Sequence, residues 1–150
     1  MNSPQAAQQP PNCEVLLVDD DENVVMVIGD YLQGKGFRVV RATSGQMALE
    51  LLPAHPDIKI AVLDFDMPVM NGMALLERIN LLKKESGLKM QVLFLTAQNS
   101  SILALNLLRK QVFFYMSKPV NLHQLVEALQ DAYRELDRPP EPSVMSQVSD

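Results

Sequence analysis

Polar and charged side chains follow four of the apolar runs in this sequence, each at the point where the run ends. The four sets, in chain order, are Asp19 and Asp20, Asp64 and Asp66, Thr96, and Lys118. An acid directly after a buried strand is costly unless something at the end of the strand uses it. A lone aspartate in such a place is most often a helix cap, so each set is weak evidence by itself. Four sets in equivalent places indicate one shared site.

Carboxylates gathered at one site favour a cation. They repel one another and raise each other's pKa unless a cation joins them. Carboxylate and carbonyl oxygens suit a hard divalent ion, and Mg²⁺ most of all when a phosphate group completes its coordination. A lysine and a threonine hydroxyl opposite the metal would neutralise further phosphoryl oxygens. The residue types therefore predict a site that holds a phosphoryl group, with an aspartate as a possible covalent acceptor.

Strands and helices that could position these side chains alternate along the chain. Short apolar runs predict strands at 15–18, 37–41, 58–63, 90–95 and 112–116. Apolar residues at helical spacing predict a helix after each strand, beginning near Asp21 or Asn23, Ser44, Met73, Ser100 and Asn121.

This alternation predicts an α/β fold in which helices cover both faces of a parallel sheet. The nearly continuous apolar runs agree, because parallel strands are buried on both faces. In the first helix, Val24, Val27 and Ile28 are predicted to face the core. Functional side chains of such a sheet gather at the carboxyl ends of its strands, where the four sets lie.

Length and composition fit one acidic domain. The chain has 150 residues, 47% of them hydrophobic, which is enough for one sizeable core. A net charge of −5 and a pI near 5.0 argue against direct nucleic-acid binding, which needs a basic patch. The single cysteine, Cys13, excludes an internal disulfide. No run approaches the roughly 18 apolar residues of a membrane span, so we expect a cytoplasmic protein without membrane contact.

The two ends of the chain differ in composition from the rest. Residues 1–12 are rich in Gln and Pro and are predicted to be a disordered lead. A domain is predicted over 13–137, and 138–150 is interpreted as a tail or the start of a linker. Whether the chain stands alone or is a piece of a longer regulator stays open.

Four motifs connect the chain to a known family. They read VLLVDDD at 15–21, DFDMP with a following MNG between 64 and 72, FLTA at 94–97, and YMSKP at 115–119. Through these motifs, in this order, the chain resembles the receiver domain of two-component response regulators. The resemblance implies a flavodoxin-like, doubly wound (βα)5 sheet with strand order 2-1-3-4-5.

The resemblance also implies a phosphoacceptor and a metal site. Asp64 is expected to accept a phosphoryl group from a phosphohistidine. Mg²⁺ or Mn²⁺ is expected to bind Asp19, Asp20, the Asp64 carboxylate and the backbone carbonyl of Asp66. Such a protein is not a conventional enzyme, since its chemistry is limited to its own phosphorylation and dephosphorylation.

A switch is implied by the same resemblance. Thr96 hydrogen-bonds a phosphoryl oxygen and moves toward it on activation, while Lys118 pairs with another oxygen. Tyr115 matches the aromatic residue that turns inward when the threonine moves, and the peptide bond before Pro119 is expected to be cis.

Partners and the lifetime of the phosphoryl group follow from the family as well. The donor is expected to be a sensor histidine kinase or a histidine phosphotransfer protein. The output is expected through the face formed by the helix from Ser100, the strand 112–116 and the last helix, toward a downstream protein or an attached output domain. A homodimer stays possible. Asp66 and Gln98 hold positions that tune dephosphorylation, in a direction that the sequence leaves open.

Two other functions compete with this one. Asp64 and Asp66 also form the Asp-x-Asp motif of haloacid-dehalogenase-like aspartyl phosphatases, although that motif usually lies on the first strand of the chain. A receiver-like scaffold that is never phosphorylated is the third hypothesis. Many turnovers of a small phosphomonoester would favour the phosphatase, and failure to take up a phosphoryl group would favour the scaffold.

Overall fold

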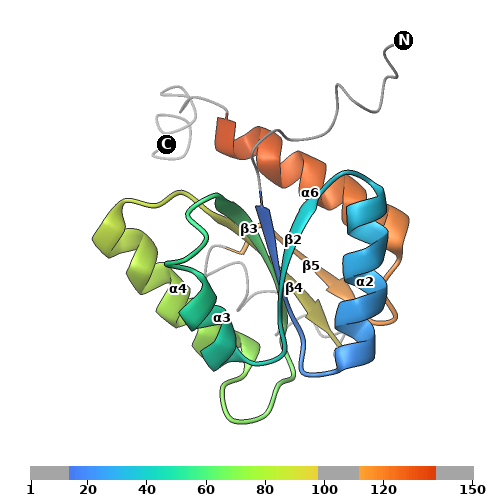
Figure 1. Ribbon diagram of the computed structural model, residues 1–150, viewed down its shortest axis with the longest axis horizontal. Helices are drawn as coiled ribbons and strands as arrows, with labels where there is room; N and C mark the ends of the chain where they lie inside the picture. Colours follow the sequence, from blue (N-terminus) through green and yellow to red (C-terminus); the bar gives the residue numbers. More distant parts are fainter. Residues whose placement is uncertain (1–13, 98–111, 138–150) are drawn as a thin grey trace, which may run out of the picture.

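A five-stranded parallel sheet with helices on both faces forms the centre of the molecule (Figure 1). The structure is a computed structural model and describes residues 14–97 and 112–137. The strand order is β2-β1-β3-β4-β5, with every neighbouring pair parallel. The predicted α/β class and the strand order implied by the family resemblance are therefore confirmed.

All five predicted strands are present, with ends shifted by one or two residues. They are β1 Glu14–Val18, β2 Arg38–Ala42, β3 Ile58–Asp64, β4 Gln91–Thr96 and β5 Phe114–Ser117. Phe37 was predicted to begin the second strand, but its amide donates to the carbonyl of Leu32 at 3.1 Å. Phe37 therefore belongs to the turn that closes the preceding helix rather than to the ladder of β2.

The four described helices begin at side-chain caps. They are α2 Glu22–Gly34, α3 Gly45–Leu51, α4 Gly72–Ser86 and α6 Leu122–Asp137. The capping side chains that accept a hydrogen bond from an amide of the first turn are Asp21, Ser44, Asn71 and Asn121. Gly87 ends α4 in the left-handed conformation, at φ 70°. The helix predicted from Ser100 lies outside the described residues, as do the predicted lead 1–12, Cys13 and the tail 138–150.

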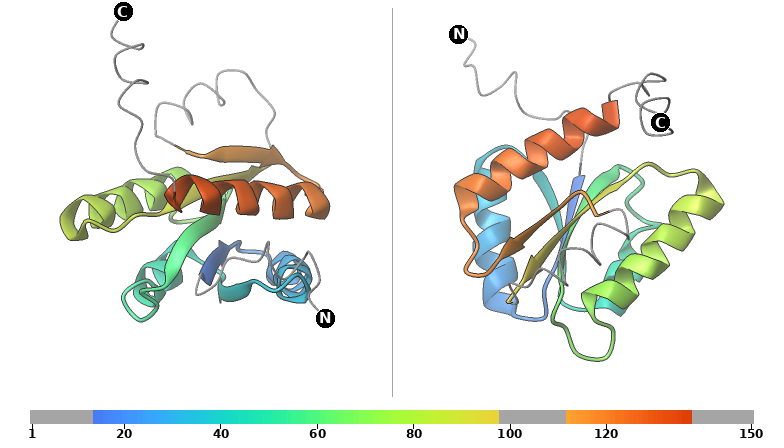
Figure 2. Two further views of the ribbon diagram at one scale, coloured as in Figure 1. Left: turned by 90° about the horizontal axis from the view of Figure 1, so that it is seen from above. Right: turned by 180° about the vertical axis from the view of Figure 1, so that it is seen from behind.

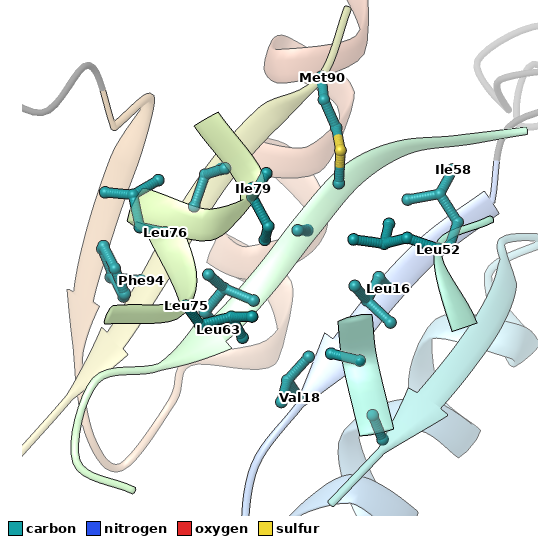
Figure 3. Close-up of a cluster of buried hydrophobic side chains, with 14 of the residues drawn as sticks. Leu16, Val18, Leu52, Ile58, Leu63, Leu75, Leu76, Ile79, Met90 and Phe94 are labelled. Carbon is teal, nitrogen blue, oxygen red and sulfur yellow. The ribbon is translucent and has the colours of Figure 1, made fainter. Parts of the chain in front are cut away.

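The helices divide between the two faces of the sheet. α3 and α4 cover one face, and α2 and α6 cover the other (Figure 2). Each pair of helices encloses its own apolar core. The core beneath α3 and α4 contains Leu16, Leu63 and Phe94, which extend from three different strands (Figure 3). No helix within residues 14–97 and 112–137 is both long and apolar enough to cross a membrane.

One predicted core position of α2 is wrong. Val27 is 53% exposed, whereas its neighbour Val25 is 5% exposed and packs in the core beneath α2 and α6. Gly29 allows the side chain of Arg41 to lie across α2, because a Cβ there would be 2.5 Å from Arg41 Cζ. The α2 side chains that face inward are Val25, Ile28 and Leu32.

Candidate functional site

The carboxyl ends of four parallel strands meet at one edge of the sheet. The register pairs Val18 with Leu63, Asp64 with Leu95, and Thr96 with Ser117. Asp19 and Lys118 follow the last residues of β1 and β5 directly. The sheet topology thus explains why residues far apart in the sequence reach one site.

Three consecutive acids after β1 lie in three different environments. Asp19 is fully buried, and its amide donates to the carbonyl of Ala42 at 3.2 Å. Its Oδ1 accepts a hydrogen bond from the Asp21 amide at 2.9 Å, and Asp21 Oδ1 in turn accepts from the Asn23 amide at 2.9 Å as the cap of α2. Asp20 lies exposed between them. The turn therefore directs one carboxylate inward and leaves one at the rim.

Lys118 joins the two buried carboxylates. Its Nζ lies 2.9 Å from Asp19 Oδ2 and 3.1 Å from Asp64 Oδ1. The two carboxylate side chains are only 1% and 2% exposed, whereas the lysine side chain is 27% exposed. The Lys118 amide donates to the carbonyl of Thr96 at 2.8 Å, and the expected cis bond to Pro119 is confirmed.

Three carboxylates of the site could share a metal ion. Among the described residues, Asp19, Asp20 and Asp64 each offer an oxygen atom, and these atoms lie within 4.8 Å of one another. An all-oxygen donor set of this kind fits Mg²⁺ or Mn²⁺ better than a softer metal. Lys118 supplies one positive charge against these three carboxylates, so a divalent ion would complete the charge balance.

The pKa values at the site reflect this crowding. Burial raises the pKa of Asp19, and the charge of Asp64 adds to the rise, against hydrogen bonds from the Asp21 amide and Lys118. Partial loss of water raises the pKa of Asp20, together with a hydrogen bond and charge repulsion from Asp64. Burial lowers the pKa of Lys118, but its hydrogen bonds to Asp19 and Asp64 outweigh that effect and raise it overall. The carboxylates repel one another, and the lysine compensates for this only in part.

The side chain of Asp66 contacts the end of β4. Its amide donates to Asp64 Oδ1 at 3.1 Å, and its Oδ2 accepts a hydrogen bond from the Ala97 amide at 3.1 Å. The side chain thereby connects the loop after β3 to the end of β4. The sequence motifs do not predict this contact. The pairing of two adjacent parallel strands is the signal that could have suggested that residues 66 and 97 lie opposite each other.

The remaining predicted site residues lie close by or outside the described part. Thr96 is fully buried at the end of β4. Tyr115, on β5, is half-buried and packs against the core beneath α3 and α4. It pairs in the sheet with Phe94, two residues before Thr96. Gln98 lies outside the described residues.

The loop between β3 and α4 turns tightly beside the site. Val69 is fully exposed and has a φ of 67°, which a β-branched residue rarely adopts. The Gly72 amide donates to the carbonyl of Phe65 at 3.0 Å, which brings the start of α4 against the end of β3. A Cβ at Gly72 would lie 2.6 Å from the carbonyl oxygen of Asp64, so only glycine fits this approach.

The fold and these residues together define a class of protein, namely flavodoxin-like domains with an acidic site, a lysine and a threonine at the carboxyl edge of the sheet. The family model described as the response regulator receiver domain matches residues 15–130. The chain therefore belongs to the response regulator receiver domains of two-component systems. This family match favours a receiver over the dehalogenase-type phosphatase.

Curated relatives agree with this family. The chain is 35% identical over 118 residues to the transcriptional regulatory protein GlrR of Escherichia coli K12, an alignment that covers 79% of this chain and 26% of the relative. It is also 35% identical over 107 residues to the two-component response regulator ORR5 of Oryza sativa subsp. japonica, covering 71% of this chain and 78% of the relative. The chain thus spans about a quarter of the length of GlrR.

Solved structures have the same fold. A receiver domain protein from Clostridium thermocellum superposes with a TM-score of 0.74 at 25% identity, over 82% of this chain and 95% of the other. A CheY-like receiver domain protein from Methanospirillum hungatei JF-1 gives a TM-score of 0.73 at 25% identity, over 83% and 95%.

Proposed function

We propose that this domain accepts a phosphoryl group on Asp64 from a phosphohistidine of a sensor histidine kinase or a histidine phosphotransfer protein. The observation that carries the proposal is the position of the Asp64 carboxylate, nearly buried at the end of β3 with Lys118 Nζ 3.1 Å from its Oδ1. In the transfer, the P–N bond of the phosphohistidine breaks and a P–O bond to Asp64 forms. The imidazole nitrogen keeps the electron pair of the broken bond, and Asp64 becomes an acyl phosphate.

The surrounding residues serve this transfer by position and charge. Lys118 already lies between Asp19 and Asp64, so its ammonium can pair with a phosphoryl oxygen without a large movement. Asp19, Asp20, the Asp64 carboxylate and the backbone carbonyl of Asp66 would hold Mg²⁺ or Mn²⁺. Bound there, the ion would neutralise phosphoryl oxygens beside the carboxylates.

A two-state switch follows in this proposal. The Thr96 hydroxyl moves toward a phosphoryl oxygen, and Tyr115 turns inward in response. The sheet supports such coupling, because Tyr115 pairs with Phe94 and the backbone of Lys118 bonds to Thr96. Phosphorylation thereby biases a surface formed by β5, α6 and the segment from Ser100. That surface would control a downstream protein or an attached output domain, or pair with a second copy of the chain.

The receiver domain runs over 13–137, and the site acts in the cytoplasm, where histidine kinases present their phosphohistidine. Direct nucleic-acid binding is not part of the function proposed for this acidic domain. The relative GlrR is a transcriptional regulatory protein, which indicates transcriptional output for that protein.

Intact-mass analysis tests the proposal. Wild type is incubated with acetyl phosphate and Mg²⁺, and we expect the mass to rise by one phosphoryl group per chain. Asp64→Asn should keep the unmodified mass, whereas Asp66→Asn, a matched loss of charge two residues away, should still be modified. An unmodified wild type would favour the scaffold hypothesis, and steady release of phosphate from a small phosphomonoester would favour the phosphatase.

A further inference from the structure

The carboxylate of Asp66 holds a backbone amide at the end of β4. The Ala97 amide donates to Asp66 Oδ2 at 3.1 Å, and the Asp66 amide donates to Asp64 Oδ1 at the same distance. Asp66 therefore contacts the proposed acceptor through its backbone and the residue after Thr96 through its side chain.

The sheet explains why this amide is available. Asp64 pairs with Leu95, and the Phe65 amide donates to the carbonyl of Leu95 at 2.8 Å. β3 ends at Asp64 and β4 ends at Thr96, so Ala97 lies past the ladder and opposite Asp66. In the described structure, the carboxylate of Asp66 takes the place of a strand partner for the Ala97 amide.

We infer that Asp66 acts as a latch, because its carboxylate holds the Thr96–Ala97 turn in the unphosphorylated position. A phosphoryl group on Asp64 must displace this latch. This inference rests on the proposed function, and it makes Asp66 a positioning residue that acts on the switch rather than on the transferred group.

Charge makes the latch sensitive to phosphorylation. A phosphoryl group adds about two negative charges, and here they would arise beside the side chain of Asp66, whose backbone amide donates to Asp64 Oδ1. The repulsion weakens the contact between Asp66 and Ala97 while Thr96 is drawn toward the phosphoryl oxygens. By linkage, the factor by which this contact favours the unphosphorylated turn is also the factor by which it lowers the affinity for a phosphoryl group.

Two variants and one control separate the latch from a general charge effect. Asp66→Ala removes the acceptor and the charge, and Asp66→Asn removes the charge but keeps an oxygen acceptor. Glu22→Gln removes one exposed charge from the first turn of α2, at the same edge of the sheet, without touching Ala97. Because Asp66 is exposed, its replacement leaves the core intact.

The first measurement uses the metal-free, unphosphorylated chain. Hydrogen exchange of the Ala97 amide, followed by NMR, should accelerate about tenfold in Asp66→Ala, as expected when a hydrogen bond to a charged group is lost. Asp66→Asn should show a smaller change and Glu22→Gln none. An Ala97 exchange rate that is unchanged in Asp66→Ala would overturn the latch.

The second measurement is binding of beryllofluoride with Mg²⁺, a mimic of the acyl phosphate. Affinity should increase several-fold in Asp66→Ala, by less in Asp66→Asn, and not in Glu22→Gln. A weaker affinity in Asp66→Ala would overturn the latch alone. Failure of the wild type to bind beryllofluoride would instead overturn the proposed function, and this inference with it.

Discussion

Replacing Gly72 with alanine should destabilise the domain, although alanine is the better helix former. The added Cβ would lie 2.6 Å from the carbonyl oxygen of Asp64, 2.6 Å from Phe94 Cε1 and 2.8 Å from Phe65 Cα. Two of these three atoms belong to the backbone of β3 and the residue after it, so no change of rotamer can relieve the overlap. The start of α4 must therefore move away from the sheet.

The size of the expected destabilisation by Gly72→Ala follows from two opposing effects. Alanine in a helix gains up to about 1 kcal/mol over glycine. Overpacking a close contact costs about 1–3 kcal/mol, and contacts with backbone atoms belong to the upper part of that range. We expect a net loss of about 2 kcal/mol in the free energy of unfolding, or roughly 6 °C in the melting temperature of a chain of this size.

A second glycine supplies the matched control. Gly34 is the last residue of α2, and a Cβ there meets nothing within 4 Å. Gly34→Ala should therefore raise the stability by about 0.5–1 kcal/mol. Urea unfolding of both variants, with equal m-values, measures the difference. The reasoning is refuted if Gly72→Ala unfolds at the same urea concentration as Gly34→Ala or at a higher one.

Val69→Asn should raise the unfolding free energy by about 1 kcal/mol, since asparagine tolerates a positive φ better than valine; an unchanged urea midpoint would contradict this. Because the folded pKa values of Asp19 and Asp20 are raised, metal-free stability should fall as pH rises from the ordinary aspartate range through these raised values. Asp20→Asn should show a smaller fall of the melting temperature with pH than wild type, and it should gain less stability from Mg²⁺. A pH profile identical to that of wild type would contradict the raised pKa of Asp20. Lys118→Ala leaves Asp19 and Asp64 without their cation and should cost about 3 kcal/mol in metal-free buffer. Mg²⁺ should restore much of that loss, and equal stabilisation of variant and wild type by Mg²⁺ would contradict the charge balance described above.

Much of the fold follows from local sequence. The strands could be predicted because buried parallel strands are nearly continuous apolar runs, as β3 shows with six of its seven residues buried. The helix starts could be predicted where Asp21, Ser44 and Asn121 precede an apolar repeat. The site could be placed because Asp19, Asp64, Thr96 and Lys118 lie at equivalent ends of their strands.

Other features depend on contacts that local patterns do not encode. The rotation of α2, which buries Val25 and exposes Val27, depends on how the helix packs against the sheet and α6. The hydrogen bond from Ala97 to Asp66 depends on the register of β3 against β4. The positive φ of Val69 contradicts its residue type, since tertiary geometry overrides the local preference there.

The position of the phosphoryl group on the chain can be determined by chemical reduction. Borohydride reduces an aspartyl phosphate to homoserine. The protein is therefore phosphorylated with acetyl phosphate and Mg²⁺, reduced, digested and sequenced by mass spectrometry. Homoserine is expected at position 64 and at no other aspartate. Homoserine at Asp19, Asp20 or Asp66 would contradict the assignment of the acceptor, as would phosphate uptake that leaves position 64 unreduced.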